Sequence, residues 1–250
     1  MKKYGLIGYP LGHSFSKGYF AEKFKKCGIV DCKYDNYPID SIEKLKKLLY
    51  DEPELEGLNV TIPYKEKVLP FLDDIDINAK EIGAVNTLKI KRIGDKITLK
   101  GYNTDVYGFS ESLKKIIGPQ HTNALILGTG GAAKAVAWAL KSMGISYKYV
   151  SRQTNNKQYL NYTGLNAEII AEHKLIINTS PAGMYPNVNI APDIPYEGIA
   201  REHVLYDLIY NPEETLFLKY GAQKKATTLN GLPMLYLQAE RAWEIWNSNT

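Results

Sequence analysis

Apolar and polar positions in the first hundred residues alternate between strand-like and helix-like segments. Helical periodicity at residues 16–28 and 41–51 predicts two helices, with Gly28 ending the first and Ser41 placed to cap the second. β-strands are predicted before, between and after them, at residues 3–9, 33–39 and 57–63. Strands separated by helices predict an α/β fold with a mainly parallel sheet.

The next segment has a different pattern. Residues 84–103 contain two extended runs around Gly94 and Asp95, which predicts a β-hairpin. Residues 105–117 then show helical periodicity that closes at a glycine-proline pair.

The α/β pattern restarts after that break. An alanine-rich helix is predicted at residues 129–144, and a long C-terminal helix at residues 231–246. Strands are predicted at residues 123–128, 146–152, 174–180 and 203–210. The pattern therefore predicts two α/β domains with a helical tail.

The amino-acid composition is typical of a soluble globular protein. The chain has 250 residues, 44% hydrophobic and 23% charged, and no apolar run is long enough to span a bilayer or form a signal peptide. Cys27 and Cys32 suit neither a disulfide framework nor a metal site, so we expect reduced cysteines in a cytoplasmic protein.

The charge distribution and the histidine positions limit which ligands and binding partners are expected. The net charge of +4 comes from scattered lysines without a basic, aromatic-interleaved stripe, which disfavours nucleic acid and suits an anionic small molecule. No metal site and no membrane contact are predicted. The histidines have no ligand spacing: His13, His121, His173 and His203.

A glycine-rich turn joins the strand at 123–128 to the helix that follows. Gly128, Gly130 and Gly131, with Thr129 and Ala132, allow a tight turn and close approach of a pyrophosphate to the helix N-terminus. Such turns also occur for packing alone, but the surrounding strand–helix–strand order favours a dinucleotide.

The end of the next strand indicates which dinucleotide. NAD sites usually offer an acidic residue there, whereas an arginine suits a 2′-phosphate. This chain has Ser151, Arg152 and Thr154 and no carboxylate. We therefore predict NADP as the cofactor.

Polar residues gather near the ends of the first domain's strands. Asn59, Thr61 and Lys65 follow one strand, and Asn86 and Asp105 stand in or beside apolar runs. Each alone could bond a turn, cap a helix or face solvent. Together they suit a polyhydroxylated substrate with one reacting carbinol.

Ser14 and Ser16 stand one residue apart before the first predicted helix. One serine can cap a helix, and two exceed that need. Either one is spare or both hydroxyls point at a ligand.

Eight motifs in order resemble those of the shikimate dehydrogenase family, across residues 5–246. They are HSFS, NVTIPYK, GAVNT, GYNTD, GTGGAAK, NTSPAGM, YDLIYNPEETLFL and GLPMLYLQAERAWEIW. The resemblance implies NADPH-dependent, reversible reduction of 3-dehydroshikimate to shikimate, in the pathway to chorismate and aromatic amino acids.

The resemblance also implies roles for individual residues. Ser14 and Ser16 would bind the substrate carboxylate, and Lys65 and Asp105 would flank the reacting C3 oxygen. The ring hydroxyls would be bound by Thr61, Asn86 and Gln238. The remaining assignments are Asn59 to the wall of the substrate site, Tyr210 to the substrate side, and Leu208 and Gly231 to the nicotinamide end.

The chemistry of ketone reduction indicates a role for Lys65 in proton transfer. Hydride transfer to a ketone leaves charge on oxygen, which needs a proton donor or a positive group. An Asp105 carboxylate beside Lys65 would favour the charged ammonium. We expect Lys65 to transfer the proton itself.

The resemblance implies a division of labour between the domains. Residues 1–101 with 233–250 would bind substrate and carry catalysis, and residues 102–232 would form a Rossmann-like NADP domain. The C-terminal helix would return to the first domain. We expect a monomer or homodimer.

This chain departs from the family pattern at two places. Lys17 stands where the family commonly has proline, and Ser151-Arg152-Gln153 replaces the usual NRT. Retention of Arg152 still favours NADP.

Three rival functions share parts of this sequence pattern. One is a quinate or dual quinate/shikimate dehydrogenase. Another is a ligand-sensing homologue without turnover, which should have lost Lys65 or Asp105. The third is a Rossmann-like binding domain with an unrelated first half.

Overall fold

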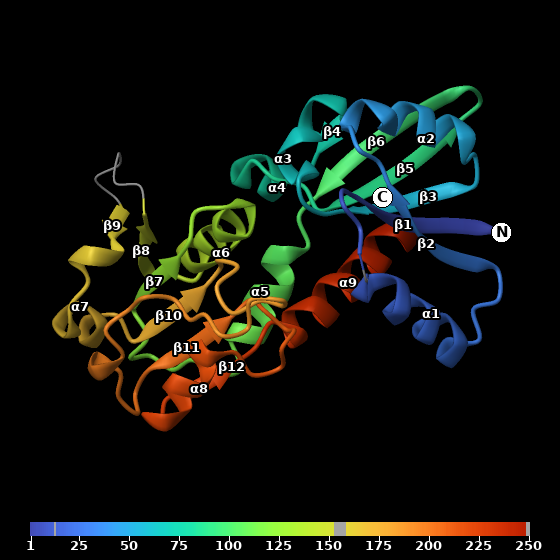
Figure 1. The fold of residues 1–250 in the computed structure, drawn as a ribbon. Coiled ribbons are helices and arrows are strands. Elements are labelled where there is room, and N and C mark those ends of the chain that lie inside the picture. Colours follow the sequence, from blue (N-terminus) through green and yellow to red (C-terminus); the bar gives the residue numbers. More distant parts are fainter. Residues whose placement is uncertain (13, 153–158, 249–250) are drawn as a thin grey trace. The chain divides into compact units, whose positions relative to one another are not determined.

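The computed structural model describes residues 1–12, 14–152 and 159–248, which form two compact units (Figure 1). One unit comprises Met1–Thr104 and Ala239–Thr250, and the other Asp105–Gln238. Each unit contains a six-stranded sheet. The α9 helix (Leu232–Asn247) begins in the second unit and ends in the first, as predicted for the C-terminal helix.

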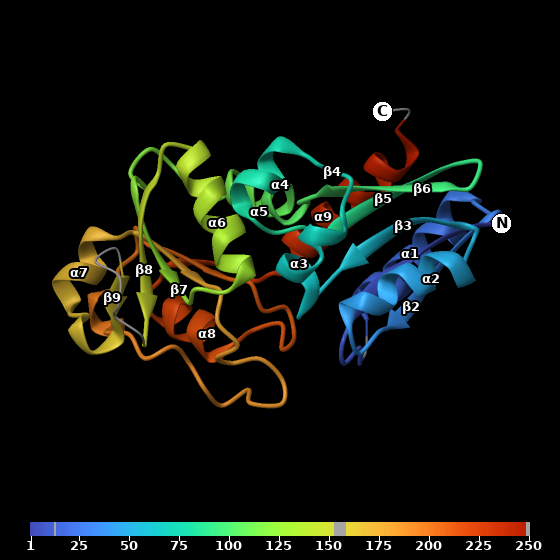
Figure 2. The ribbon, with the colours of Figure 1, turned by 90° about the horizontal axis from the view of Figure 1, so that it is seen from above.

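The sheet of the first unit has the order β2-β1-β3-β5-β6-β4. Its strands are β1 (Lys2–Gly8), β2 (Cys32–Pro38), β3 (Leu55–Val60), β4 (Asp74–Ile75), β5 (Thr87–Ile93) and β6 (Lys96–Tyr102). β1 pairs in parallel with β2 and β3, and β4 with β6. The predicted hairpin is confirmed, because β5 and β6 run antiparallel from Ile93 and Lys96 at the turn (Figure 2).

Helices cover both faces of this sheet. They are α1 (Phe15–Cys27), α2 (Leu45–Asp51), α3 (Tyr64–Lys67), α4 (Ile77–Ile82) and the end of α9. Tyr4 of β1 packs with α1 and α9, whereas Ile7 packs with α2, because successive strand residues face opposite sides. The first side is aromatic, with Tyr4 stacked on Trp246 at 4.9 Å between ring centroids.

The predicted end of the first helix is confirmed, whereas the predicted cap at the start of the second is wrong. α1 ends at Gly28, whose φ of 64° lies in the left-handed region that favours glycine, as predicted. The second predicted helix instead begins as a 3₁₀ turn at Ile42–Lys44 before α2. Ser41 makes no capping hydrogen bond there, so that prediction was wrong, because its hydroxyl bonds the Glu43 carboxylate instead.

The sheet of the second unit is parallel throughout the described residues and has the order β12-β11-β10-β7-β8-β9. Its strands are β7 (Asn123–Leu127), β8 (Ser146–Ser151), β9 (Tyr159–Asn161), β10 (Leu175–Asn178), β11 (Val204–Asp207) and β12 (Thr227–Leu229). The other helices are α5 (Asp105–Leu113), α6 (Gly131–Ser142), α7 (Ala167–Glu172) and α8 (Leu216–Gln223). This doubly wound arrangement confirms the predicted Rossmann-like class.

Several elements of the second unit were not predicted or end elsewhere. The short strands β9 and β12 and the helices α7 and α8 were missed. α5 stops at Leu113, four residues before the predicted end, and the Ile116 amide then donates to the Leu113 carbonyl three residues back, as in a turn of 3₁₀ type. The second unit also has 3₁₀ turns at Tyr162–Gly164 and Tyr196–Gly198, and the first unit has one at Leu69–Phe71.

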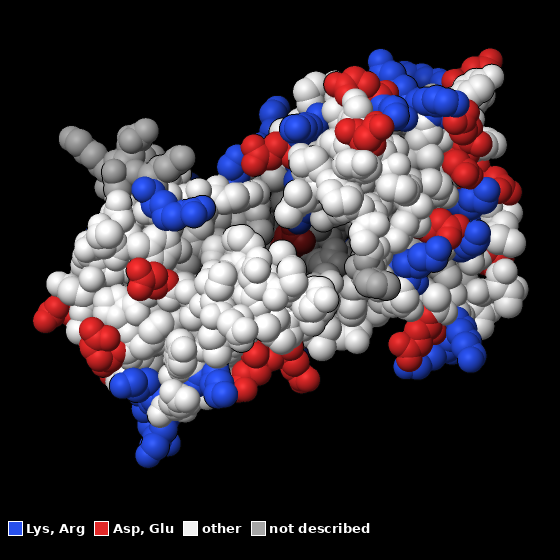
Figure 3. All heavy atoms as spheres, in the orientation of Figure 1, with Lys and Arg blue, Asp and Glu red and all other residues white. Residues whose placement is uncertain are grey.

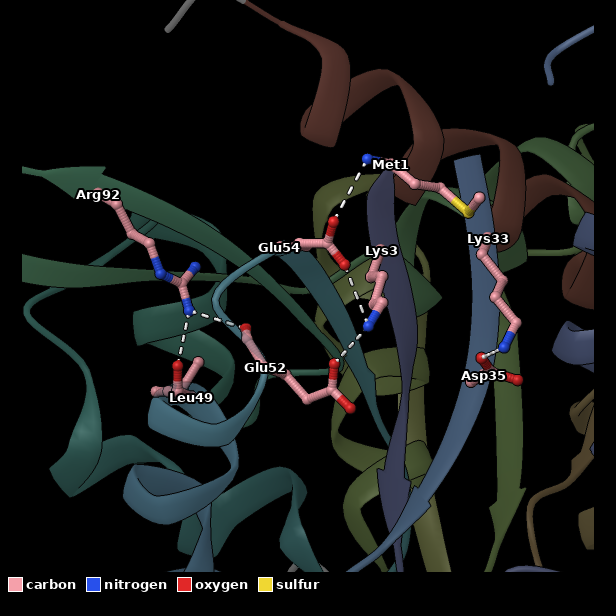
Figure 4. Close-up of polar contacts among 8 residues, drawn as sticks. All are labelled: Met1, Lys3, Lys33, Asp35, Leu49, Glu52, Glu54 and Arg92. Atoms are coloured by element: carbon pink, nitrogen blue, oxygen red, sulfur yellow. Dashed lines mark hydrogen bonds and ion pairs between the residues drawn. The ribbon is translucent and has the colours of Figure 1, made fainter. Parts of the chain in front are cut away.

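Charged side chains stabilise the end of the first sheet where β1 begins. Lys3 Nζ lies 2.8 Å from a Glu52 carboxylate oxygen and 3.1 Å from one of Glu54 (Figure 4). The Arg92 guanidinium donates to the backbone carbonyls of Leu49 and Glu52. On the face shown in Figure 3, positive and negative side chains are interspersed. None of the helices within the described ranges is long and apolar enough to cross a membrane.

Candidate active site

The predicted polar residues of the first unit meet around the end of β3. Asn59 is the last but one residue of β3, and Thr61 follows it directly. The Thr61 amide donates to the Ile7 carbonyl at 2.9 Å, which ties this loop to the end of β1. A Cβ on Gly8 would lie 2.4 Å from the Thr61 side chain, so only glycine admits Thr61 there.

Lys65 lies on the short helix α3, immediately after this loop. Its neighbour Tyr64 is buried and donates a 2.6 Å hydrogen bond to the Ile39 carbonyl, which anchors the helix. The Lys65 carbonyl accepts from the Val85 amide at 2.8 Å. The backbone of Lys65 is thus held on both sides, while its side chain is half-buried.

A buried hydrogen-bond network connects Asn59 with Asn86. The Asn59 Nδ2 donates to the Asn86 carbonyl at 3.4 Å and to the Thr87 hydroxyl at 3.2 Å. The Asn86 Oδ1 accepts from the Thr104 amide at 2.7 Å, and its Nδ2 donates to the Thr104 hydroxyl at 3.0 Å. Asn86 therefore fixes the backbone immediately before Asp105.

The two serines of the first motif have different surroundings. Ser14 is the N-cap of α1, and its hydroxyl accepts from the Lys17 amide at 3.3 Å. Ser16 lies in the first turn of α1 and is buried. The Lys17 ammonium, which replaces the family proline, pairs with Asp35 at 2.9 Å, and Lys33 pairs with the same carboxylate at 2.6 Å.

Three residues predicted for catalysis or substrate binding belong to the second unit. Asp105 is the first residue of α5 and is buried, a position where the helix dipole favours a carboxylate. Gln238 is buried on α9, and Tyr210 is exposed after β11. A Cβ on Gly108 would lie 2.5 Å from the Met234 carbonyl oxygen. Because glycine has no Cβ, α5 and α9 can pack closely near Asp105 and Gln238.

The glycine-rich turn has the geometry a pyrophosphate requires. Gly128 has a φ of 113°, and a Cβ there would lie 2.8 Å from the Thr179 hydroxyl. Gly130 is the N-cap of α6, offers no capping side chain, and has open space where a Cβ would stand. Thr129 is exposed, and Gly131 and Ala132 open the helix half-buried. The α6 N-terminus can thus receive an anion.

The residues predicted to bind the 2′-phosphate lie at the end of β8 and directly after it. Ser151 is its last residue and is buried, and Arg152 comes next and is exposed. Thr154 lies outside the described residues. No cluster of three or more His, Cys, Asp or Glu side chains that could hold a metal ion occurs in the described part of the chain.

Leu208 and Gly231, predicted to meet the nicotinamide end, contact each other. A Cβ on Gly231 would lie 2.1 Å from the Leu208 carbonyl oxygen. The Gly231 amide donates to the Ile209 carbonyl at 3.0 Å. Two loops far apart in the sequence are thereby joined after β11 and β12.

We expect Gly231→Ala to weaken NADP binding and lower the free energy of unfolding by about 1–3 kcal/mol, because the added methyl displaces the Leu208 backbone. Calorimetric titration with NADP+ and urea unfolding measure both effects. Gly164→Ala is the matched control, since nothing lies within 4 Å of its Cβ position. Wild-type values for Gly231→Ala would contradict the close contact.

Asp207, at the end of β11, is a fully buried carboxylate that the sequence analysis missed. Its side chain accepts from the Thr215 hydroxyl at 2.6 Å, the Asn178 amide at 3.0 Å and the Ile209 amide at 3.0 Å. Burial raises its pKa to about 6, although these three donors oppose the shift. Asp207 thus orders the loop that begins with Leu208.

The raised pKa of Asp207 predicts a pH-dependent stability. The folded state holds its proton more tightly than the unfolded state, so the contribution is present below about pH 4 and is lost by about pH 6. The shift corresponds to at most about 3 kcal/mol. Asp207→Asn keeps the hydrogen-bonding shape and should remove this decline. Urea unfolding across that pH range tests it, and parallel wild-type and variant profiles would contradict it.

The sequence analysis also missed the buried partners of the substrate-site asparagines. Thr87 and Thr104 are 0% and 1% exposed, and both belong to Asn-Thr pairs, in GAVNT and GYNTD. That repeated pair was the available signal. Tyr34 lies 25 residues from Asn59 and gave no local signal.

Comparison with known proteins places this geometry in a family. A family model described as the shikimate dehydrogenase substrate binding domain matches residues 6–88. The shikimate dehydrogenase (NADP(+)) of Carboxydothermus hydrogenoformans is 40% identical over 259 residues, covering 97% of this chain and 90% of that protein.

Solved structures agree. Shikimate 5-dehydrogenase from Thermus thermophilus, in complex with NADP(H) and shikimate, is 30% identical with a TM-score of 0.84, over 99% of this chain and 94% of that one. Quinate dehydrogenase from Corynebacterium glutamicum, in complex with NAD, is 26% identical with a TM-score of 0.87, over 98% and 93%. The chain belongs to the shikimate dehydrogenase family.

Proposed function

We propose that this chain catalyses the reversible, NADP-dependent reduction of 3-dehydroshikimate to shikimate, in the pathway to chorismate and aromatic amino acids. The observation that carries the proposal is the Asn59–Asn86 network at the end of β3, because it presents fixed amide groups beside the Lys65 helix. A ligand rich in hydroxyl groups matches such a wall. The Carboxydothermus hydrogenoformans relative, 40% identical over 97% of this chain, is named shikimate dehydrogenase (NADP(+)).

The serine motif is the proposed site for the substrate carboxylate. The Ser14 hydroxyl oxygen accepts a hydrogen bond from the Lys17 amide, so the hydroxyl proton remains available to donate to a carboxylate. Ser16 would contribute a second hydroxyl from the first turn of α1. Ring hydroxyls would be bound by Thr61, Asn86 and Gln238, with Asn59 and Tyr210 completing the substrate contacts.

Lys65 and Asp105 are the proposed catalytic residues. The dinucleotide, when bound, supplies the hydride to the carbonyl carbon. The Lys65 ammonium gives its proton to the carbonyl oxygen as charge develops there, and takes it back when shikimate is oxidised. Asp105 accepts a hydrogen bond from the resulting hydroxyl and orients it.

The glycine-rich turn and the end of β8 are the proposed NADP site. The pyrophosphate would lie at the α6 N-terminus, where Gly128 and Gly130 keep the backbone accessible. Arg152 would bind the 2′-phosphate, with Ser151 and Thr154 beside it. Leu208 and Gly231 would contact the nicotinamide end.

A quinate or dual dehydrogenase is the second candidate. The likeness to quinate dehydrogenase of Corynebacterium glutamicum, in complex with NAD, favours testing it. Two serines at the motif and Arg152 after β8 support shikimate with NADP.

The test is reduction of 3-dehydroshikimate by the purified chain with NADPH or NADH, with the product identified by mass spectrometry. We expect shikimate to form, and faster with NADPH. Preferential reduction of 3-dehydroquinate, or preference for NADH, would favour the second candidate. Failure to consume either cofactor would contradict both.

A further inference from the structure

Tyr34 of β2 lies at the start of the hydrogen-bond network behind the proposed substrate site. Its hydroxyl donates to Asn59 Oδ1 at 2.8 Å, and Asn59 Nδ2 then donates to Thr87 and to the Asn86 carbonyl. The Thr87 hydroxyl in turn donates to Asn86 Oδ1 at 3.2 Å. Within this chain of groups every donor meets an acceptor.

The network is shielded from water. Tyr34, Asn59, Asn86 and Thr87 are each 5% exposed or less. A buried amide whose oxygen lost its donor would keep an unsatisfied polar atom or rotate to find another partner. The Tyr34 hydroxyl, together with the Asn86 carbonyl on the other side, therefore fixes the orientation of the Asn59 amide.

Burial also keeps Tyr34 a hydrogen-bond donor. Loss of solvation raises the pKa of the Tyr34 phenol well above its ordinary value, although a hydrogen bond from Ser16 opposes the shift. The hydroxyl therefore keeps its proton for the hydrogen bond to Asn59 Oδ1.

The position of the Tyr34 ring does not depend on its hydroxyl. The ring stacks on Phe20 with centroids 4.6 Å apart and packs near Trp246 at 6.3 Å. Phenylalanine at position 34 would keep these contacts. The hydroxyl can therefore be removed without emptying the core.

We propose that Tyr34 is a positioning residue for substrate binding, whose hydroxyl holds the Asn59 amide in the orientation the substrate requires. This inference rests on the proposed function, which makes Asn59 a substrate contact. Tyr34 acts through Asn59 and needs no contact with the ligand itself.

The test is the steady-state kinetics of Tyr34→Phe with shikimate and NADP+. Because one buried hydrogen bond contributes about 1 kcal/mol, we expect the KM for shikimate to rise about fivefold to tenfold. The kcat and the KM for NADP+ should stay within about twofold, since neither depends on this orientation. A purely structural role would instead lower kcat or stability as well. Tyr37→Phe, which removes a hydroxyl from the same strand, is the matched control.

A double-mutant cycle isolates the route through Asn59. In an Asn59→Ala background, Tyr34→Phe should change the KM for shikimate much less than in the wild type. An unchanged KM in the single variant, or an equal rise in both backgrounds, would overturn the proposal while wild-type turnover leaves the proposed function standing. A wild-type chain that does not oxidise shikimate would overturn both.

Discussion

Replacing Lys65 with alanine is expected to lower kcat for shikimate oxidation by about a thousandfold, within the range that general acid–base groups contribute. In the proposed reaction Lys65 alone exchanges the proton with the C3 oxygen, so the variant leaves developing charge without a partner. Its backbone is held by the Tyr64 anchor and the Val85 hydrogen bond, which do not use the lysine side chain. The variant should therefore fold normally.

Stopped-flow or steady-state NADPH formation measures the loss of activity in Lys65→Ala. Lys67→Ala is the matched control, because Lys67 is exposed and ends the same helix. We expect Lys67→Ala to keep wild-type kcat. Near-normal turnover of Lys65→Ala would refute both proton transfer and simple polarisation by this lysine.

Asp105→Asn is expected to lower kcat by about a hundredfold. The amide keeps the size of the carboxylate but accepts the substrate hydroxyl as a neutral group, and hydrogen bonds to charged groups are worth about 1.5–3 kcal/mol. Asp105 is buried at the first turn of α5, so bulk water cannot substitute for it. Initial rates at saturating NADP+ and shikimate measure the effect.

The control for Asp105→Asn is Glu111→Gln on the same helix. Glu111 is partly exposed and pairs with Lys114 at 2.6 Å, an interaction of the kind that contributes about 1 kcal/mol or less. Its loss should leave kcat unchanged. Equal rates for Asp105→Asn and Glu111→Gln would remove Asp105 from the catalytic residues.

Local signals explain which elements could be predicted from the sequence. Gly28 ends α1 and Gly94 lies in the β5–β6 turn because both need positive φ, which glycine supplies from its own chemistry. The glycine-rich turn before α6 was likewise predictable, since Gly128 also has positive φ. Such features depend on residues within a few positions of one another.

Features that depend on distant partners could not be predicted in this way. Ser41 has the right residue type for a cap, but it bonds Glu43 instead. One of the three donors to the buried Asp207 carboxylate is Asn178, which lies 29 positions away. Tyr34 could be linked to Asn59 only once β2, β1 and β3 were placed side by side. The substrate-site residues were predicted from motifs, whereas the hydrogen-bond network among them is formed by strands that come together only in the folded protein.

The most direct test of the central claim is NADPH formation by the purified chain from shikimate and from quinate, each with NADP+ and with NAD+. Mildly alkaline pH is suitable because alcohol oxidation releases a proton. The account predicts strong turnover with shikimate and NADP+, exceeding the other three pairs. A chain that binds NADPH yet turns over none of the four pairs would contradict it and would identify a ligand-sensing homologue instead.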